Sequence, residues 1–208
     1  MKKIVLLALL ALALPLAAFA GNVDFQNAGG MLSGSSAGLT LTGSELVSVT
    51  GFNGGGLIQG GLGTVSFTTA ALTAGNLQTG ATFAAGGTFV ITGDGSNGIP
   101  NGVLFNGTFS GPVTWTEFQS GTGSTGSIYY TLQGSISGTY WNGSTYTTVN
   151  GATIQITFNA GVNGFQGSVP LGSGDTVIGT TVPEPGTLGL LGTGLVGLAG
   201  VIRKKLKA

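Results

Sequence analysis

The residues that could carry out chemistry in the central part of this chain are few and of one kind. Between residues 21 and 181 there is no Lys, Arg, His or Cys, so mechanisms that need a histidine base, a thiolate or a lysine amine have no candidates there. Metal sites built on His or Cys are excluded for the same reason. Carboxylate chemistry remains, since five acids occur in this stretch: Asp24, Glu45, Asp94, Glu117 and Asp175.

Two of these acids could form the acid and the nucleophile of a glycoside hydrolase if folding brought them within several ångströms of each other. Their spacing along the chain does not pair them, and scattered acids on an exported surface usually serve as solvating charges. We therefore expect no enzyme, no catalytic residue and no cofactor. A carboxylate-dependent glycoside hydrolase is kept as a remote alternative.

One oxygen-rich segment, residues 94–98 (Asp-Gly-Ser-Asn-Gly), could contribute to a calcium site. Calcium takes six to eight oxygen ligands, and this segment has a single carboxylate. Asp-Gly and Asn-Gly are also ordinary turn formers. We expect a turn and no metal site here, unless Glu45, Glu117 or Asp175 folds nearby.

The aromatic residues with polar edges gather in one third of the central region. Exposed rings of this kind could stack on sugars, and Tyr129, Tyr140, Trp141 and Tyr146 are candidates for a carbohydrate-contacting patch. The alternative is that these rings fill the core or pair across strands, and the alternation of the sequence already directs Tyr130 inward.

Ice binding needs a flat, regular array of Thr side chains. Thr-x-Thr pairs occur at Thr40/Thr42 and Thr145/Thr147, but they do not recur at a constant interval. Because Thr is β-branched and uncharged, it is also a common residue on the solvent face of a strand. We interpret these pairs as solvent-facing strand residues.

The elements that must position these side chains are predicted to be strands. Apolar and polar residues alternate most clearly at residues 128–136 and 153–158, which indicates strands with one buried face. Similar alternation occurs at residues 39–41, 47–49, 65–67, 89–91, 103–109 and 113–115. Eight Asn-Gly or Asp-Gly pairs supply tight turns, although Gly107 falls inside a strand pattern and marks a bulge or a flat position. We predict an antiparallel β-sandwich, with a β-solenoid as the alternative.

The N-terminus is predicted to be a secretory signal peptide. Lys2 and Lys3 precede an apolar run at residues 4–14, Pro15 follows, and small residues end at Ala20. The apolar run is too short to span a bilayer of about 30 Å. We expect signal peptidase to cleave between Ala20 and Gly21.

The C-terminus contains a second hydrophobic segment between a proline-rich stretch and a basic end. Pro183-Glu184-Pro185 should be extended and accessible to an enzyme, because proline donates no backbone hydrogen bond and disfavours a helix before it. Residues 187–202 would form a glycine-rich transmembrane helix about 24 Å long. Arg203, Lys204, Lys205 and Lys207 would keep the tail cytoplasmic by the positive-inside rule.

This C-terminal arrangement resembles the PEP-CTERM sorting signal of Gram-negative bacteria. The resemblance covers residues 182–208 and rests on the Pro-Glu-Pro tripeptide, the glycine-rich apolar segment and the basic end. It implies recognition of the tripeptide by an exosortase, a membrane-embedded transpeptidase-like protease, in bacteria that make exopolysaccharide or biofilm. The same kind of segment is also described as the C-terminal motif of ice-binding proteins, but the motif by itself indicates no ice-binding activity.

Together these features predict an exported, non-enzymatic surface or extracellular-matrix protein. The central region has no basic residue, so nucleic acid is not an expected partner. Extracellular polysaccharide is an expected partner because of what the resemblance to the sorting signal implies. A carbohydrate-binding or ice-binding adhesive module is the alternative. The expected organisation is a signal peptide at 1–20, an exported β domain at 21–170, a linker at 171–186, a transmembrane helix at 187–202 and a cytoplasmic tail at 203–208.

Overall fold

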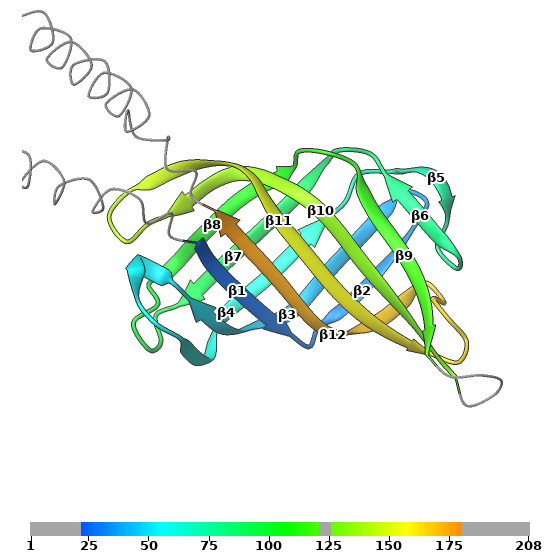
Figure 1. Ribbon diagram of the computed structural model, residues 1–208, viewed down its shortest axis with the longest axis horizontal. Helices are drawn as coiled ribbons and strands as arrows, with labels where there is room; N and C mark the ends of the chain where they lie inside the picture. The colour runs from blue at the N-terminus through cyan, green and yellow to red at the C-terminus, as the bar shows by residue number, and fades with distance from the viewer. Residues whose placement is uncertain (1–21, 121–125, 180–208) are drawn as a thin grey trace, which may run out of the picture. The chain divides into compact units, whose positions relative to one another are not determined.

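The computed structural model describes residues 22–120 and 126–179, which form twelve strands and one 3-10 turn (Figure 1). The elements are β1 (Asn22–Ala28), β2 (Met31–Ser35), β3 (Gly38–Thr50), η2 (Phe52–Gly54), β4 (Ile58–Thr68), β5 (Leu72–Asn76), β6 (Gly80–Phe83), β7 (Gly86–Asp94), β8 (Asn101–Phe109), β9 (Val113–Ser120), β10 (Ser127–Trp141), β11 (Tyr146–Gly161) and β12 (Ser168–Gly179).

Eight of the strands close into an antiparallel barrel. The ring runs β1, β3, β4, β7, β8, β10, β11, β12 and back to β1, and every neighbouring pair is antiparallel. In Figure 1, β10, β11, β12 and β1 lie in front and cross steeply over β4, β7 and β8 behind them. The predicted β-sandwich and its β-solenoid alternative are therefore both wrong, because the two layers are joined by continuous hydrogen bonding into one closed sheet.

Closure depends on long strands that change partners along their length. The first half of β10, residues 127–133, pairs with β9, and its second half, residues 136–140, pairs with β8. A register shift between Ile136 and Gly138 on the β11 side accompanies this change. Such bulges bend a strand and increase its twist, so they allow a sheet to curl and close.

Glycines occupy the point where β8 and β10 meet. Gly107 and Gly138 are directly paired, and a Cβ atom on Gly138 would lie 2.5 Å from the Gly107 Cα. A Cβ atom on Gly107 would lie 2.8 Å from the ring of Phe105. Of the two possibilities predicted for Gly107, a bulge or a flat strand position, the structure shows the flat position. The backbones of β8 and β10 can approach this closely only because neither glycine has a side chain.

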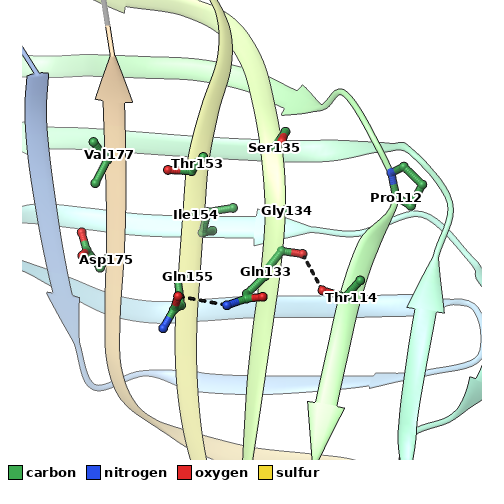
Figure 2. A pocket seen from close by; sticks show the side chains of 10 residues that line it. All are labelled: Pro112, Thr114, Gln133, Gly134, Ser135, Thr153, Ile154, Gln155, Asp175 and Val177. Atoms are coloured by element: carbon green, nitrogen blue, oxygen red, sulfur yellow. Dashed lines mark hydrogen bonds between the residues drawn. The ribbon is translucent and has the colours of Figure 1, made fainter.

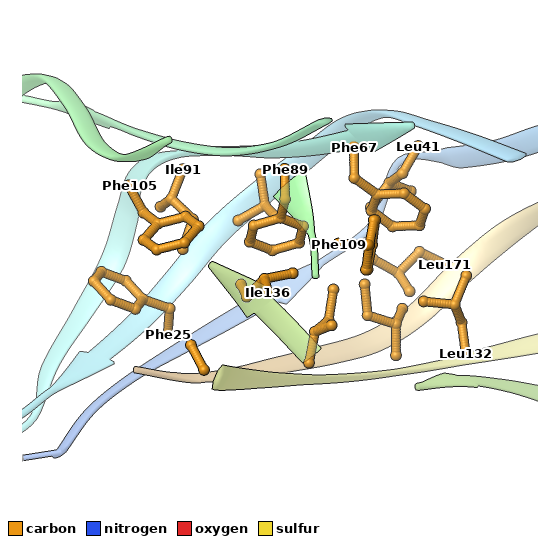
Figure 3. Close-up of a cluster of buried hydrophobic side chains, with 14 of the residues drawn as sticks. Phe25, Leu41, Phe67, Phe89, Ile91, Phe105, Phe109, Leu132, Ile136 and Leu171 are labelled. Atoms are coloured by element: carbon orange, nitrogen blue, oxygen red, sulfur yellow. The ribbon is translucent and has the colours of Figure 1, made fainter. Parts of the chain in front are cut away.

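The barrel interior is filled with apolar side chains. Aromatic residues from β4, β7 and β8 face aliphatic residues from β10 and β12 across the interior (Figure 3). Phe67 and Phe109 meet edge to face with ring centroids 5.9 Å apart, and Phe89 and Phe105 do so at 6.0 Å. Edge-to-face contacts of this kind add to the stabilisation from burial, so the interior is a packed core.

A second aromatic cluster packs where β9 meets β10. Trp115 stacks on Tyr130 with ring centroids 4.6 Å apart and contacts Phe158 and Phe165. The Trp115 indole N–H donates to the Leu77 carbonyl at 3.1 Å, which ties the segment between β5 and β6 to this cluster. The polar edges of the rings therefore fix a loop while their faces fill the core.

The alternation read from the sequence locates most of the core correctly. Residues such as Leu132, Ile136, Ile154 and Ile156 are buried as predicted. Val103 is an exception, because it is 38% exposed while its neighbours Leu104 and Phe105 are both buried. A register shift between β7 and β8 at this point places two consecutive residues inward, which breaks the alternation.

Several expectations concern residues that the structure does not describe. The expected signal peptide and its cleavage site, the transmembrane helix at 187–202 and the basic tail lie outside the described residues. Residues 171–179, which we expected in the linker, form the last part of β12. Within residues 22–120 and 126–179, no helix has the length and apolar character needed to cross a membrane.

Candidate functional site

The outer surface of β9, β10, β11, β12 and β1 carries polar side chains in rows that run across the strands. We name this surface the polar face. Its three rows, given in order of strand pairing, are Thr116, Thr131, Thr157 and Ser173; then Thr114, Gln133, Gln155, Asp175 and Gln26; then Ser135, Thr153, Val177 and Asp24, in which Val177 is the one apolar member. Neighbours within a row lie about 4.8 Å apart between strands, and successive rows lie about 6.8 Å apart.

A hollow of about 510 Å³ lies over the middle of the polar face (Figure 2). Its lining side chains include Gln133, Gln155, Thr153 and Asp175. The Gln133 amide donates to the Gln155 side-chain oxygen at 3.0 Å, so the two amides hold each other in place. The hollow therefore offers oriented amide and hydroxyl groups with little charge, a composition suited to hydrogen bonding with a hydroxylated ligand.

A second hollow of about 330 Å³ adjoins the first. Gln155 and Asp175 line both, and Gln26 and Ser173 extend the surface toward β1. Because the two hollows share residues along one row, the polar face is continuous across β9–β12 and β1. It is long enough for a ligand to contact several strands at once.

Two of the five acids meet on the polar face. Burial, a hydrogen bond with Asp175 and the nearby Asp175 charge together raise the pKa of Asp24 from 3.8 to about 6. The expectation that this chain is not an enzyme stays a prediction.

The acid at the oxygen-rich loop takes part in a turn. The Asp94 carboxylate accepts a hydrogen bond from the Ser96 amide at 2.8 Å, and Asn97 adopts a left-handed backbone with φ of 53°. Among the described residues, no three acids gather in a way that could hold a metal ion.

The four aromatic candidates for sugar contact lie in three different environments. Tyr140 is 2% exposed and packs edge to face against Phe25 and Phe52, so its inclusion among the surface candidates was wrong. It occupies an inward position of β10, directly before the half-buried Trp141. Tyr129 is half-buried and stacks on Phe118, with ring centroids 5.1 Å apart.

Trp141 and Tyr146 form the third environment at the hairpin that joins β10 to β11. They are paired across the strands, with ring centroids 5.1 Å apart and planes 58° apart. The Tyr146 hydroxyl donates to the Val103 carbonyl at 2.9 Å. With residues 100–104 the two rings line a pocket of about 320 Å³.

The Thr pairs considered for ice binding do not form a free array. Thr145 lies in the turn after β10, and the Thr147 hydroxyl donates to the Tyr140 carbonyl at 3.3 Å. Thr40 pairs with Thr68, whose hydroxyl is hydrogen-bonded to Thr88 at 2.9 Å. The two pairs thus lie in different surroundings, and the Thr147 hydroxyl is already bonded within the protein.

The comparisons with known proteins identify the C-terminal segment. A family model described as the PEP-CTERM protein-sorting motif matches residues 181–204. No curated protein and no solved structure matches the chain. The barrel is thus assigned by its geometry alone.

The motif confirms the suspected PEP-CTERM sorting signal. It implies that the chain is an exported protein, anchored to the membrane before processing and processed by an exosortase. The matched segment contains Pro183, Glu184 and Pro185, which lie outside the residues that the structure describes.

Proposed function

We propose that this chain is an exported, non-enzymatic protein of the cell surface or extracellular matrix whose barrel binds extracellular polysaccharide through the polar face. The observation that supports this most directly is the continuous set of amide and hydroxyl rows on one side of a barrel whose interior is packed. Hydroxylated polymers present repeating donors and acceptors, which such rows can match.

The charge pattern favours a neutral polymer. All five charged residues between positions 21 and 181 are acidic, so polyanions would be repelled. The sorting motif supports delivery to an outer layer, because it implies export and exosortase processing. Release or attachment after processing would place the barrel among the polymers of a biofilm matrix.

Sedimentation with polysaccharide tests this function. The mature protein is mixed with insoluble polysaccharide purified from the matrix of the native host, and the bound fraction is measured. The variant with Gln133→Glu and Gln155→Glu places two charges in the central row, and we expect its binding to fall about tenfold or more.

The control is Ser66→Glu, which adds a charge at an exposed position on β4, outside the polar face. This variant should bind as the wild-type protein does. Equal binding of the wild-type protein and the double variant would refute the role of the polar face.

A further inference from the structure

We infer that the pocket beside Trp141 and Tyr146 is a separate subsite that holds one neutral pyranose ring. This inference rests on the proposed contact with polysaccharide, but it concerns residues outside the polar face. The pocket is formed where the β10–β11 hairpin lies over the start of β8, with Pro100 and Asn101 at its edge.

The aromatic rings of this pocket are held in place before any ligand arrives. The turn that joins the two strands is closed by Asn142, whose side-chain oxygen accepts hydrogen bonds from the Ser144 and Thr145 amides. The hydrogen bond from Tyr146 to the Val103 carbonyl fixes the orientation of the phenol ring. Binding therefore orders few side chains, which lowers its entropic cost.

The exposure of the rings suits stacking against a sugar. Tyr146 is 54% exposed and Val103 is 38% exposed, while Trp141 is half-buried. The C–H groups on one face of a pyranose carry slight positive charge, and they match the negative face of an aromatic ring. The rings of Trp141 and Tyr146 and the Val103 side chain thus give the pocket apolar surface for the less polar face of the sugar.

The remaining lining groups suit hydroxyls and not charges. Asn101 is exposed and can both donate and accept hydrogen bonds, and no charged side chain lines the pocket. A volume of about 320 Å³ lies at the small end of the range for ligand pockets. A single neutral ring therefore fits better than a longer segment or an acidic sugar.

The other exposed aromatic pair provides a matched comparison. Phe118 and Tyr129 stack nearly parallel, with planes 14° apart, so each ring covers one face of the other. Trp141 and Tyr146 are tilted by 58° and line a hollow. Only the second pair has the geometry of a sugar subsite.

Tryptophan fluorescence of the mature protein tests this inference, because the chain has two tryptophans in different environments. Trp115 is 1% exposed, so acrylamide quenching reports mainly on Trp141. The probes are the neutral hexasaccharides cellohexaose, mannohexaose and maltohexaose, with hexagalacturonate as the anionic comparison. We expect at least one neutral probe to protect Trp141 from acrylamide with a Kd of about 1 mM, and hexagalacturonate to give no protection.

Variants then assign the effect to the pocket. Tyr146→Ala should raise the Kd for the protecting probe at least tenfold. A melting curve of this variant serves to check that its barrel is folded. Phe118→Ala, which removes an exposed ring of similar size elsewhere, should leave protection unchanged.

Three results would overturn the inference. The first is that no neutral probe protects Trp141 from acrylamide, and the second is that Tyr146→Ala and Phe118→Ala lose protection equally. The third is that the pocket binds a protein and no sugar. Even if the pocket binds no sugar, sedimentation of the protein with polysaccharide should still depend on Gln133 and Gln155. The two sites are therefore tested separately.

Discussion

Two tyrosines on β10 show how much one hydroxyl group matters in this core. The Tyr130 hydroxyl donates to the Gln78 carbonyl at 2.9 Å and accepts from the Phe165 amide at 3.2 Å. The Tyr140 hydroxyl is buried and has no hydrogen-bond partner among the described residues, and burial raises its pKa to about 12. A buried polar group without a partner is destabilising, whereas one with two partners is not.

Replacing each tyrosine by phenylalanine should therefore have opposite effects. Tyr140→Phe removes an unpaired buried hydroxyl and should raise the free energy of unfolding by about 1 kcal/mol. Tyr130→Phe leaves two backbone groups without a partner and should lower the free energy of unfolding by about 1–2 kcal/mol. Urea titrations of both variants check this, and the same sign for both would contradict the assignment.

The carboxyl pair on the polar face predicts a dependence of stability on pH. The pKa of Asp24 is about 6 in the folded protein, above its ordinary value of 3.8, so the folded state binds the proton more tightly. The free energy of unfolding should be highest below about pH 4 and fall as the pH rises to 6. Because Asp24 is partly exposed, solvent screening limits the change to the order of 1 kcal/mol.

Thermal melts from pH 4 to pH 8 measure this dependence. Asp24→Asn should melt at a higher temperature than the wild-type protein at pH 8, and the difference should shrink toward pH 4. A constant difference across this range would show that the pair does not hold a shared proton.

The pairing of β8 with β10 helps to close the barrel, and two facing glycines make this pairing possible. Gly138→Ala would push a methyl group into the backbone of β8, so we expect a loss of at least 2 kcal/mol in the free energy of unfolding. Gly111→Ala is the control, because a Cβ atom at Gly111 meets nothing within 4 Å. If urea titration gives the same free energy of unfolding for both variants, the close approach of β8 and β10 does not contribute to the stability of the barrel.

The sequence was sufficient to predict strands and their inward faces, because alternation and turn residues act locally. It did not predict the closed barrel, because closure depends on which distant strands pair, and β10 changes partners at a bulge that leaves little mark on the sequence. The polar face was missed for the same reason. Thr131, Gln133 and Thr153 could be assigned to outer surfaces, but not to neighbouring strands.

The carboxyl pair illustrates the same limit. Asp24 lies on the first strand and Asp175 on the last, and only the pairing of β1 with β12 brings them together. Tyr140 was misjudged because an aromatic residue with a polar edge fits both the surface and the core. The sorting motif was recognised because its tripeptide, apolar segment and basic end are contiguous in the sequence.

The barrel begins at Asn22 and ends at Gly179, which are paired on β1 and β12. The chain therefore enters and leaves the barrel at neighbouring positions, and all eight strands of the closed ring lie between these two residues. Processing near the sorting motif at 181–204 should leave the barrel intact.

We propose that this barrel reaches the extracellular matrix by way of its sorting signal, and intact mass measured on fractions of the native host tests this proposal. The wild-type protein should be recovered outside the cell with Gly21 as its first residue and without Arg203, Lys204 and Lys205. Glu184→Ala should hold the protein in the membrane fraction with its C-terminus uncut, while the control Thr193→Ala should mature normally. Recovery of the Glu184→Ala protein outside the cell with the same mass as the processed wild-type protein, apart from the substitution, would show that the tripeptide does not direct processing.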